Sequence, residues 1–385
     1  MTVSTRWVDQ DEELGRAAAE AAAAPRLALD TEADAFHAYR PRLCLAQLAW
    51  ETDGGIEIAL VDTLALAGRL GPLRGLLEQP GLEKIVHGAP YDVRMLRLAE
   101  RIELRGLFDT QVAAQLLGLP QTSLAALALA FADVHLDKAG QKVDWSRRPL
   151  PPAALRYASE DVRLLFRLRA ELGRRLADAG RGDWAEEEFR RIENAPAPVE
   201  TRRDPDELAA RIPGASKLGP AARGALLELL AWREAEAERR NVAAIRVLQP
   251  DLLGELALRQ PADAAGLAAA RVPESARRRY GAEILAAIRR GRERPAVAPR
   301  RTVARPPAGE RKRFAALRAV RDARARELGL EPSVLCPSAA LRALAARGPE
   351  TEAELLAAGL RRWQAALLGE DLRAALAQAD PAPGS

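Results

Sequence analysis

The chain has 385 residues, of which 48% are hydrophobic and 29% are charged, as is typical of a globular protein. This length predicts two or three domains, each able to bury its own core. The net charge is only +4, and nearly all basic residues are arginine. A site for an anionic partner therefore has to come from local clusters of arginine, because the overall charge is too small to attract one.

Neither secretion nor membrane insertion is indicated by the sequence. Cys44 and Cys336 lie far apart among apolar neighbours, so we predict no disulfide. The N-terminus lacks a basic segment followed by an apolar one, and no uncharged apolar stretch is long enough to cross a bilayer. We predict a cytoplasmic monomer without a membrane segment. No feature of the sequence indicates a protein partner.

Strand and helix patterns alternate in the first 195 residues. We expect a short strand at 6–8 and then a helix to about 23 that begins with a capping box of Asp9 and Glu12. Strands follow at 27–30, 43–50 and 56–61, with a hairpin at Asp53-Gly54-Gly55. The later elements are a helix at 70–78, a strand at 84–87, a helix at 90–99, a strand ending at 108, helices beginning near 109 and 123, and a long helix after Pro151 and Pro152. This order predicts an α/β domain with a mixed sheet flanked by helices.

The composition changes near residue 195, where Ala-Pro-Ala-Pro at 195–198 predicts a linker and strand patterns end. Residues 206–290 and 309–378 resemble each other at a shift of 88 positions, for example in Arg233-Glu234-Ala235 and Arg321-Asp322-Ala323. We therefore predict an α/β domain at 1–195 and two related all-α domains at 206–290 and 309–378. The arginine-rich connection from 289 to 313 fits a solvated linker and a phosphate-contacting segment equally well.

Four acidic residues and a tyrosine form the candidate catalytic site. Asp30 and Glu32 are two residues apart at the end of a predicted strand, so that both side chains point to one face. Tyr157 and Asp161 are four apart on the predicted long helix and lie one turn apart on one side, and Asp92 is near the start of another helix. Carboxylates brought together in this way repel one another unless cations lie between them. Oxygen ligands favour Mg²⁺ or Mn²⁺ over Zn²⁺, and two such ions suit phosphoryl transfer.

Each of these residues also has a simpler interpretation when it is taken alone. An aspartate after a strand is usually a cap, and a tyrosine on an amphipathic helix usually belongs to the core; the ordered combination favours catalysis. The phenol of Tyr157 has an ordinary pKa near 10 and is a poor base at neutral pH, so we expect it mainly to position a reacting group. Asp109 fits a helix N-cap better than a metal ligand.

The order of these motifs resembles the ribonuclease D family. LALDTEAD at 27–34 with RPRLCLAQLA at 40–49 is similar to the family's first exonuclease motif. KIVHGAPYDVRML at 84–96 resembles the second motif, and LRYASEDVRLL at 155–165 resembles the third, with its Tyr-x-x-x-Asp spacing. FDTQVAAQLLG at 108–118 and LDKAGQKVDWSRRPL at 136–150 also resemble family segments. A sister subclass has histidine where Arg156 stands, so the tyrosine subclass is indicated. The two C-terminal units resemble the helicase-and-RNase-D C-terminal domain.

The resemblance implies a ribonuclease H-like exonuclease domain and a metal-dependent hydrolase. The expected activity is that of a 3′-to-5′ exoribonuclease that releases nucleoside 5′-monophosphates and trims 3′ ends of tRNA precursors and other small structured RNAs. By motif, Asp30, Glu32 and Asp161 would hold the ion that binds the attacking water. Asp30 would bridge to a second ion, which Asp92 would support directly or through water.

Other functions and contacts stay open at this stage. A single-strand DNA exonuclease is one alternative, because the chemistry needs no 2′-hydroxyl group, and a non-catalytic RNA-binding scaffold is another. The segment before the long helix contains Lys138, Lys142, Trp145, Arg147 and Arg148, and it fits an RNA path and a plain surface loop equally well. His87 is a candidate for a substrate contact, although a hydrogen-bonded structural role explains it better. We take His87, Lys142, Trp145 and Arg147 as the candidate substrate-binding residues.

Overall fold

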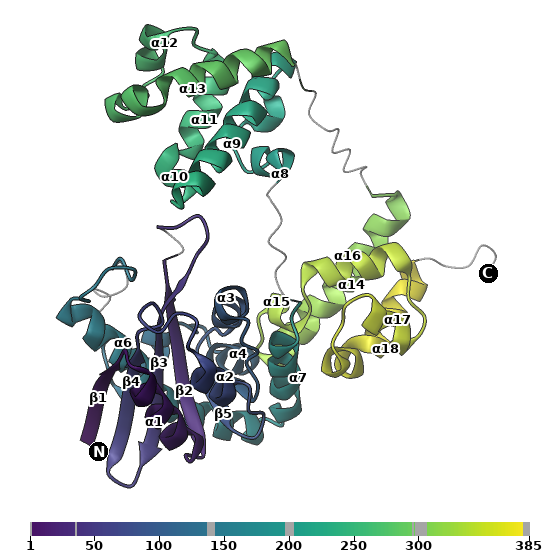
Figure 1. Ribbon diagram of the computed structural model, residues 1–385. Coiled ribbons are helices and arrows are strands. Elements are labelled where there is room, and N and C mark those ends of the chain that lie inside the picture. Colours follow the sequence, from purple (N-terminus) through teal and green to yellow (C-terminus); the bar gives the residue numbers. More distant parts are fainter. Residues whose placement is uncertain are drawn as a thin grey trace. The chain divides into compact units, whose positions relative to one another are not determined.

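The computed structural model describes residues 2–34, 37–136, 143–196, 204–294, 296 and 306–379. It forms two compact units, shown in Figure 1. One contains Met1–Ala33, Leu43–Pro198 and Arg305–Ser385, and the other contains Asp34–Arg42 and Val199–Ala304. The first unit therefore holds the sheet together with the second helical repeat, and the first helical repeat lies in the other unit.

A six-stranded mixed sheet forms the centre of the first unit. Its strands, in spatial order, are β1 (Thr2–Val8), β4 (Gly55–Val61), β3 (Leu43–Thr52), β2 (Arg26–Ala33), β5 (Glu83–Val86) and β6 (Leu107–Asp109). Only β3 runs antiparallel to its neighbours, and the other strands share one direction. The carboxyl ends of β2, β5 and β6 consequently meet at one edge of the sheet. This architecture confirms the predicted fold class.

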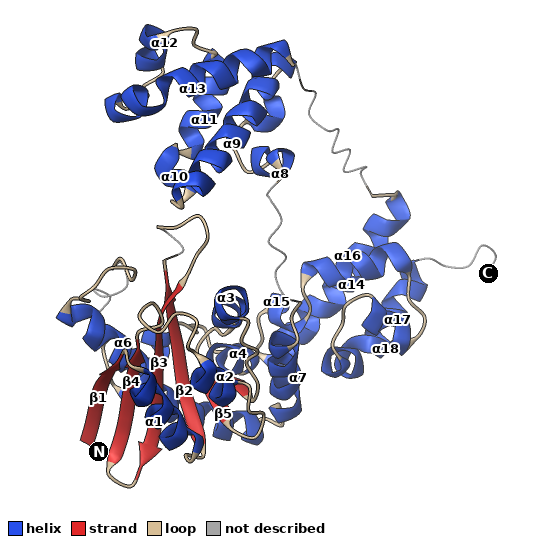
Figure 2. Cartoon of the chain, viewed as in Figure 1, coloured by secondary structure: helices blue, strands red, loops and turns tan. Residues whose placement is uncertain are grey.

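Helices cover both faces of the sheet, as Figure 2 shows. The long helix α6 (Pro152–Asp178) packs against β2, β3, β4 and β5 on one face. On β1, Thr5 points to this face, whereas its neighbour Arg6 forms an ion pair with Glu20 of α1 (Asp11–Ala22) on the opposite face. The remaining helices of this domain are α2 (Gly71–Leu77), α3 (Pro90–Glu100), α4 (Thr110–Leu116), α5 (Leu124–Ala132) and α7 (Gly182–Glu193).

Two predicted details of the first elements are wrong, and a third is confirmed. The N-cap of α1 is Gln10, which makes no side-chain cap, so Asp9 and Glu12 form no capping box. The helix begins one residue later than predicted, and the Asp9 carboxylate accepts a hydrogen bond from the Gln10 side chain at 3.0 Å. The strand expected at 6–8 extends back to Thr2, because it pairs along its whole length with β4. The hairpin is confirmed by the pairing of Thr52 with Gly55.

The helical region repeats with a fixed spacing. The first set is α9 (Pro220–Arg240), α10 (Ala244–Val247), α11 (Pro250–Arg259), α12 (Ala264–Ala269) and α13 (Glu274–Glu293), preceded by α8 (Pro205–Ala209). The second set is α14 (Ala308–Leu328), α15 (Pro332–Leu335), α16 (Ser338–Arg347), α17 (Glu352–Ala357) and α18 (Arg362–Ala379). Each helix of the second set starts 88 residues after its counterpart, as Pro220 and Ala308 illustrate. The sequence repeat is thus a repeat of structure, while the domain boundaries that we placed stay a prediction.

The second repeat is joined to the α/β domain through α7. The Glu187 carboxylate accepts hydrogen bonds from the backbone N–H groups of Arg362 and Trp363 at 2.7 and 3.0 Å, so that it caps α18. The rings of Trp184 and Trp363 stack with centroids 4.6 Å apart. Glu188, which is buried, accepts a hydrogen bond from the Trp363 indole at 3.3 Å. The second repeat is therefore docked on the α/β domain by specific contacts.

Several predictions from composition concern single residues or short segments. Cys44 and Cys336 are both free and buried, as predicted. Within the described residues no helix has the length and apolar character that a membrane span requires. The second half of the predicted linker at 195–198 and the middle of the arginine-rich connection lie outside the described residues. At the two ends of that connection, Arg290 pairs with Glu228 at 2.8 Å and Arg313 donates to the Ala345 carbonyl at 2.6 Å.

Candidate active site

The register of the sheet places Asp30 and Glu32 on the face that α6 covers. Ile58 of β4 lies on the α6 side and pairs with Ala49 of β3, which in turn pairs with Ala28 of β2. Because alternate residues of a strand share a face, Asp30 and Glu32 point to the same side as Ala28. Both are only partly buried. The two carboxylates therefore stand at the carboxyl end of β2, between the sheet and α6, with access to solvent.

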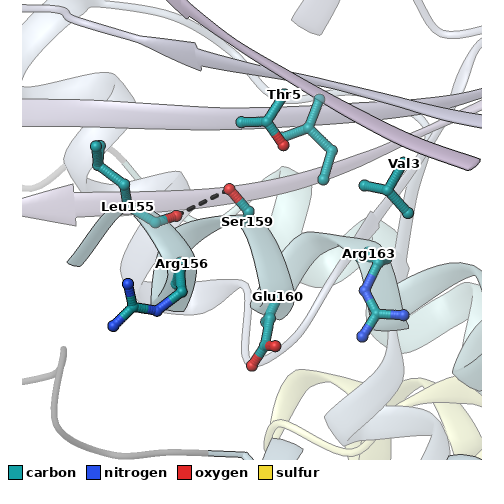
Figure 3. Close-up of a pocket in the computed structure, with 8 residues that line it drawn as sticks. Val3, Thr5, Leu155, Arg156, Ser159, Glu160 and Arg163 are labelled. Atoms are coloured by element: carbon teal, nitrogen blue, oxygen red, sulfur yellow. Dashed lines mark hydrogen bonds between the residues drawn. The ribbon is translucent and has the colours of Figure 1, made fainter. Parts of the chain in front are cut away.

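The helix α6 contributes Tyr157 and Asp161 from one of its sides. Asp161 is 5% exposed, Tyr157 is half-buried, and a hydrogen bond joins their side chains. The other side of α6 faces a hollow of about 410 Å³ beside the edge strand β1. Its rim includes Arg156, Glu160 and Arg163, whose side chains point away from the strands in Figure 3. This hollow is not lined by any of the four acidic residues, so the size of a cavity does not locate the acidic site.

The third segment places Asp92 in the first turn of α3. Asp92 is 4% exposed, and its Oδ1 accepts a hydrogen bond of 2.6 Å from the Thr31 hydroxyl. The turn before α3 is held by Asp109, whose carboxylate accepts from the backbone N–H groups of Gly88 and Ala89 at 3.0 and 2.8 Å. Asp109 also caps α4 through its Oδ1, which confirms the predicted N-cap. One buried carboxylate thus fixes the start of two helices next to the site.

The four acids share one electrostatic environment. Burial, followed by the charges of Asp92, Glu32 and Asp161, raises the pKa of Asp30 well above its ordinary value. Burial and the charges of Asp161 and Asp92 raise the pKa of Glu32 to about 8. Burial raises the pKa of Asp92 to about 7 and that of Asp161 to about 6, and hydrogen bonds from Thr31 and Tyr157 oppose these rises. The structure therefore brings together the acids that the sequence predicted.

Unpartnered polar atoms in this cluster fit a hard cation. The Asp161 Oδ1 atom is buried and has no hydrogen-bond partner among the described residues. A carboxylate oxygen without water or a donor is costly, and a divalent cation with oxygen ligands satisfies it. Among the described residues no three acidic, histidine or cysteine side chains already surround a common point as metal ligands. The donor set fits Mg²⁺ or Mn²⁺, and binding would have to turn the carboxylates toward one point.

Comparison with known proteins identifies the family. Residues 5–177 match the model of a 3′-5′ exonuclease domain, and residues 222–288 and 310–376 each match the HRDC domain. A ribonuclease D of Granulibacter bethesdensis is 34% identical over 361 residues, which cover 90% of this chain and 86% of that protein. The chain belongs to the ribonuclease D family. A ribonuclease D of Jannaschia sp. is 35% identical over 283 residues, covering 73% of this chain and 72% of that protein.

A solved structure supports the same assignment over the full ribonuclease D chain. This chain is similar to the crystal structure of Escherichia coli RNase D, an exoribonuclease involved in structured RNA processing. The match covers 98% of this chain and 100% of the Escherichia coli chain. The two share 25% sequence identity and superimpose with a TM-score of 0.72. The enzyme is a hydrolase, a 3′-to-5′ exoribonuclease, as the sequence motifs predicted. The alternative of a non-catalytic scaffold loses its basis, because the four acids and the tyrosine are all present.

Sequence reasoning missed two polar residues of this ribonuclease D site. Thr31 stands between Asp30 and Glu32 and holds Asp92, and a hydroxyl between two candidate metal ligands was the available signal. Gln47 pairs directly with Asp30 and is fully buried, and neither atom of its amide has a partner among the described residues. Gln47 falls in the strand predicted at 43–50 and confirmed as β3, but an amide beside Asp30 also belongs to the surroundings of the site.

The predicted substrate contacts of this ribonuclease D are spread over different environments. Burial lowers the pKa of His87 to about 4, and its Nδ1 lies 2.9 Å from the Thr110 hydroxyl. The Trp145 side chain is 3% exposed and offers no free ring face for stacking, although its buried Nε1 has no partner among the described residues. The Arg147 side chain is 82% exposed. Lys138 and Lys142 lie outside the described residues. Binding of substrate by these residues stays a prediction.

Proposed function

We propose that this exoribonuclease works with two divalent cations, Mg²⁺ or Mn²⁺, and releases nucleoside 5′-monophosphates. The observation that carries the proposal is a cluster of four carboxylates, each with a raised pKa, of which Asp161 has an unpartnered buried oxygen. Asp30, Glu32 and Asp161 would hold one ion, and Asp30 would also reach a second ion supported by Asp92. Bound there, the ions would lower the pKa of the attacking water and stabilise the attacking and leaving oxygens of an in-line displacement.

Tyr157 is proposed to orient the attacking water. Burial, followed by the charge of Asp161, raises the pKa of its phenol above the ordinary value, so the phenol keeps its proton at neutral pH. A protonated phenol can donate to Asp161 and can still accept a hydrogen bond through its oxygen. It can therefore hold a water molecule in line, but it cannot remove a proton from that water. This supports the positioning role that we expected from the sequence.

The 3′ ends of tRNA precursors and other small structured RNAs are the proposed substrates. All five proposed catalytic residues lie within the nuclease domain, so the two further helical domains are suited to bind the folded part of an RNA whose 3′ end enters the site. Escherichia coli RNase D, which is similar over the whole chain, is involved in structured RNA processing. We propose that His87, Lys142 and Arg147 contact the RNA, and the exposed guanidinium of Arg147 is suited to a phosphate, whereas Trp145 is 3% exposed and offers the RNA no ring face.

The test is release of labelled mononucleotides from matched substrates. A tRNA with a 3′ extension, a single-stranded RNA with the same 3′ sequence and the corresponding single-stranded DNA are incubated with Mg²⁺, Mn²⁺ or EDTA. We expect 5′-monophosphates from both RNAs with either metal, none with EDTA, and faster release from the extended tRNA. Asp161→Asn serves as the control without metal-dependent activity. Equal rates on RNA and DNA would contradict the proposed substrate, and activity in EDTA would contradict the metals.

A further inference from the structure

Arg148 lies just before α6 and uses every donor of its guanidinium group. Its Nε and Nη2 donate to the two carboxylate oxygens of Asp62 at 2.6 and 2.7 Å. Its Nη2 also donates to the Cys44 carbonyl at 2.7 Å, and its Nη1 donates to the carbonyls of Trp145 and Arg147, both at 2.8 Å. A guanidinium group has five N–H donors, and all of them are paired here. This network joins the segment before α6 to two strands of the sheet.

Asp62 gives this network a fixed anchor. It follows the last residue of β4, is 4% exposed, and its Oδ1 also accepts from the backbone N–H groups of Leu64 and Ala65 at 3.1 Å. Burial raises the pKa of Asp62, but the hydrogen bonds and the charge of Arg148 outweigh it, so that the pKa is lowered and the pair stays ionised at neutral pH. The guanidinium also lies 5.3 Å from the Trp7 ring centroid. A bidentate pair with a buried carboxylate has a more fixed geometry than a single hydrogen bond between exposed side chains.

The network reaches the candidate catalytic tyrosine through Trp145. The backbone of Trp145 lies in a turn outside any helix or strand, and Arg148 holds its carbonyl. The indole of Trp145 is 3% exposed, and its centroid lies 6.3 Å from that of the Tyr157 ring, at an angle of 42°. The helix fixes only the backbone of Tyr157. The neighbouring indole, together with the hydrogen bond to Asp161, therefore limits the directions in which the phenol can turn.

We propose that Arg148 is a positioning residue for Tyr157 and acts through Trp145. The inference rests on the proposed role of Tyr157 in orienting the attacking water. Without the five hydrogen bonds of Arg148, the turn that contains Trp145 loses its polar anchor to Asp62 and Cys44, and the indole and the phenol beside it gain freedom to move. Lysine cannot replace the arginine here, because an ammonium group has three donors and lacks the planar fork.

A double-mutant cycle with Arg148→Lys and Tyr157→Phe tests this coupling. We expect Arg148→Lys to lower kcat at least about tenfold, since a misplacement of about 1 Å can cost on the order of 10²-fold in rate. The affinity for Mn²⁺, measured by calorimetry, should change by less than about twofold, because Arg148 contacts none of the four acids. In the Tyr157→Phe background, Arg148→Lys should lower kcat by less than about twofold.

Arg169→Lys is a matched control. Arg169 also forms a bidentate pair between α6 and the sheet, with Glu83 at 2.8 to 3.0 Å, but it lies three turns beyond Tyr157. We expect this variant to leave kcat within about twofold in both backgrounds. If Arg148→Lys does not fold, Asp62→Asn, which keeps the size of the side chain, takes its place in the cycle.

The outcomes separate this inference from the proposed function. Equal fractional losses of kcat from Arg148→Lys in the wild-type and Tyr157→Phe backgrounds would overturn the coupling but leave the role of Tyr157 intact. A loss of Mn²⁺ affinity in Arg148→Lys would also overturn it, because the acids and not the tyrosine would then be displaced. An unchanged kcat in Tyr157→Phe alone would overturn both the role of Tyr157 and the inference built on it.

Discussion

Replacing Glu32 by Gln should stabilise the metal-free enzyme at alkaline pH. Burial, followed by the charges of Asp161 and Asp92, raises the pKa of Glu32 from 4.5 to about 8. Between these values the folded protein binds more protons than the unfolded chain, so the free energy of unfolding falls as the pH rises. This loss of folding stability, caused by ionising Glu32 in the folded protein, is absent below about pH 4.5 and complete above about pH 8. Glutamine does not ionise, so the Glu32→Gln variant does not lose stability in this way as the pH rises.

The size of the effect follows from the rise in pKa. One pKa unit corresponds to about 1.4 kcal/mol, so the rise to about 8 sets an upper limit of about 5 kcal/mol. Glu32 keeps some contact with solvent, which screens the charges, and we expect about 2 to 3 kcal/mol. Urea denaturation in EDTA at pH 5 and pH 8.5 measures it. At pH 5 most of the advantage of Glu32→Gln should disappear.

With divalent metal bound, the wild type should become more stable than Glu32→Gln. Saturating Mn²⁺ at pH 8.5 stabilises the wild type by binding only the folded state, and Glu32→Gln loses one ligand and part of this gain. Glu12→Gln, at an exposed position of α1, is the control. It should change the free energy of unfolding neither in EDTA nor in Mn²⁺. If metal-free Glu32→Gln is no more stable than the wild type at pH 8.5, the carboxylates do not share the environment described above.

Four further predictions address catalysis, docking and RNA binding. Asp30→Asn and Asp161→Asn should abolish nucleotide release but leave RNA affinity in a filter-binding assay nearly unchanged; near-normal turnover in either variant would refute the site. Tyr157→Phe should lower kcat by about 10²-fold with unchanged Mn²⁺ affinity in calorimetry, since it removes only a positioned hydroxyl group. Trp363→Ala should lower the free energy of unfolding by about 3 to 5 kcal/mol in urea, because a 6% exposed, stacked indole is lost. RNA affinity should fall by about 0.7 decade per decade of salt for each neutralised phosphate, and a flat response in a salt titration would argue against arginine contacts.

Local periodicity explains why most of the fold and the site could be predicted. The spacing of two in β2 and of four in α6 placed Asp30, Glu32, Tyr157 and Asp161 on the correct faces. Asp92 has no periodic partner, and only its motif pointed to it. Asp109 was predicted as a cap because it follows a strand and opens a helix, but its bonds to the turn before α3 depend on tertiary structure.

What could not be predicted depends on contacts between distant parts of the chain. Arg148 and Asp62 are 86 residues apart, and nothing in either local sequence indicates that they meet. The contact between Thr31 and Asp92 spans 61 residues. The length of β1 was underestimated for the same reason, since its first residues are exposed and become a strand only by pairing with β4. Long-range pairing of this kind leaves no period in a single sequence.

The two helical repeats have the same helices but different surfaces. In the second repeat, Arg362 and Trp363 open α18 and dock on Glu187 and Trp184. At the corresponding positions of the first repeat stand Glu274 and Ser275, 88 residues earlier.

A serine cannot stack on a tryptophan, and a glutamate at this position would repel the Glu187 carboxylate. The first repeat therefore lacks the two residues with which the second repeat contacts α7. The second repeat is thus packed on the nuclease domain through Arg362 and Trp363, and the first repeat has neither residue at the corresponding positions.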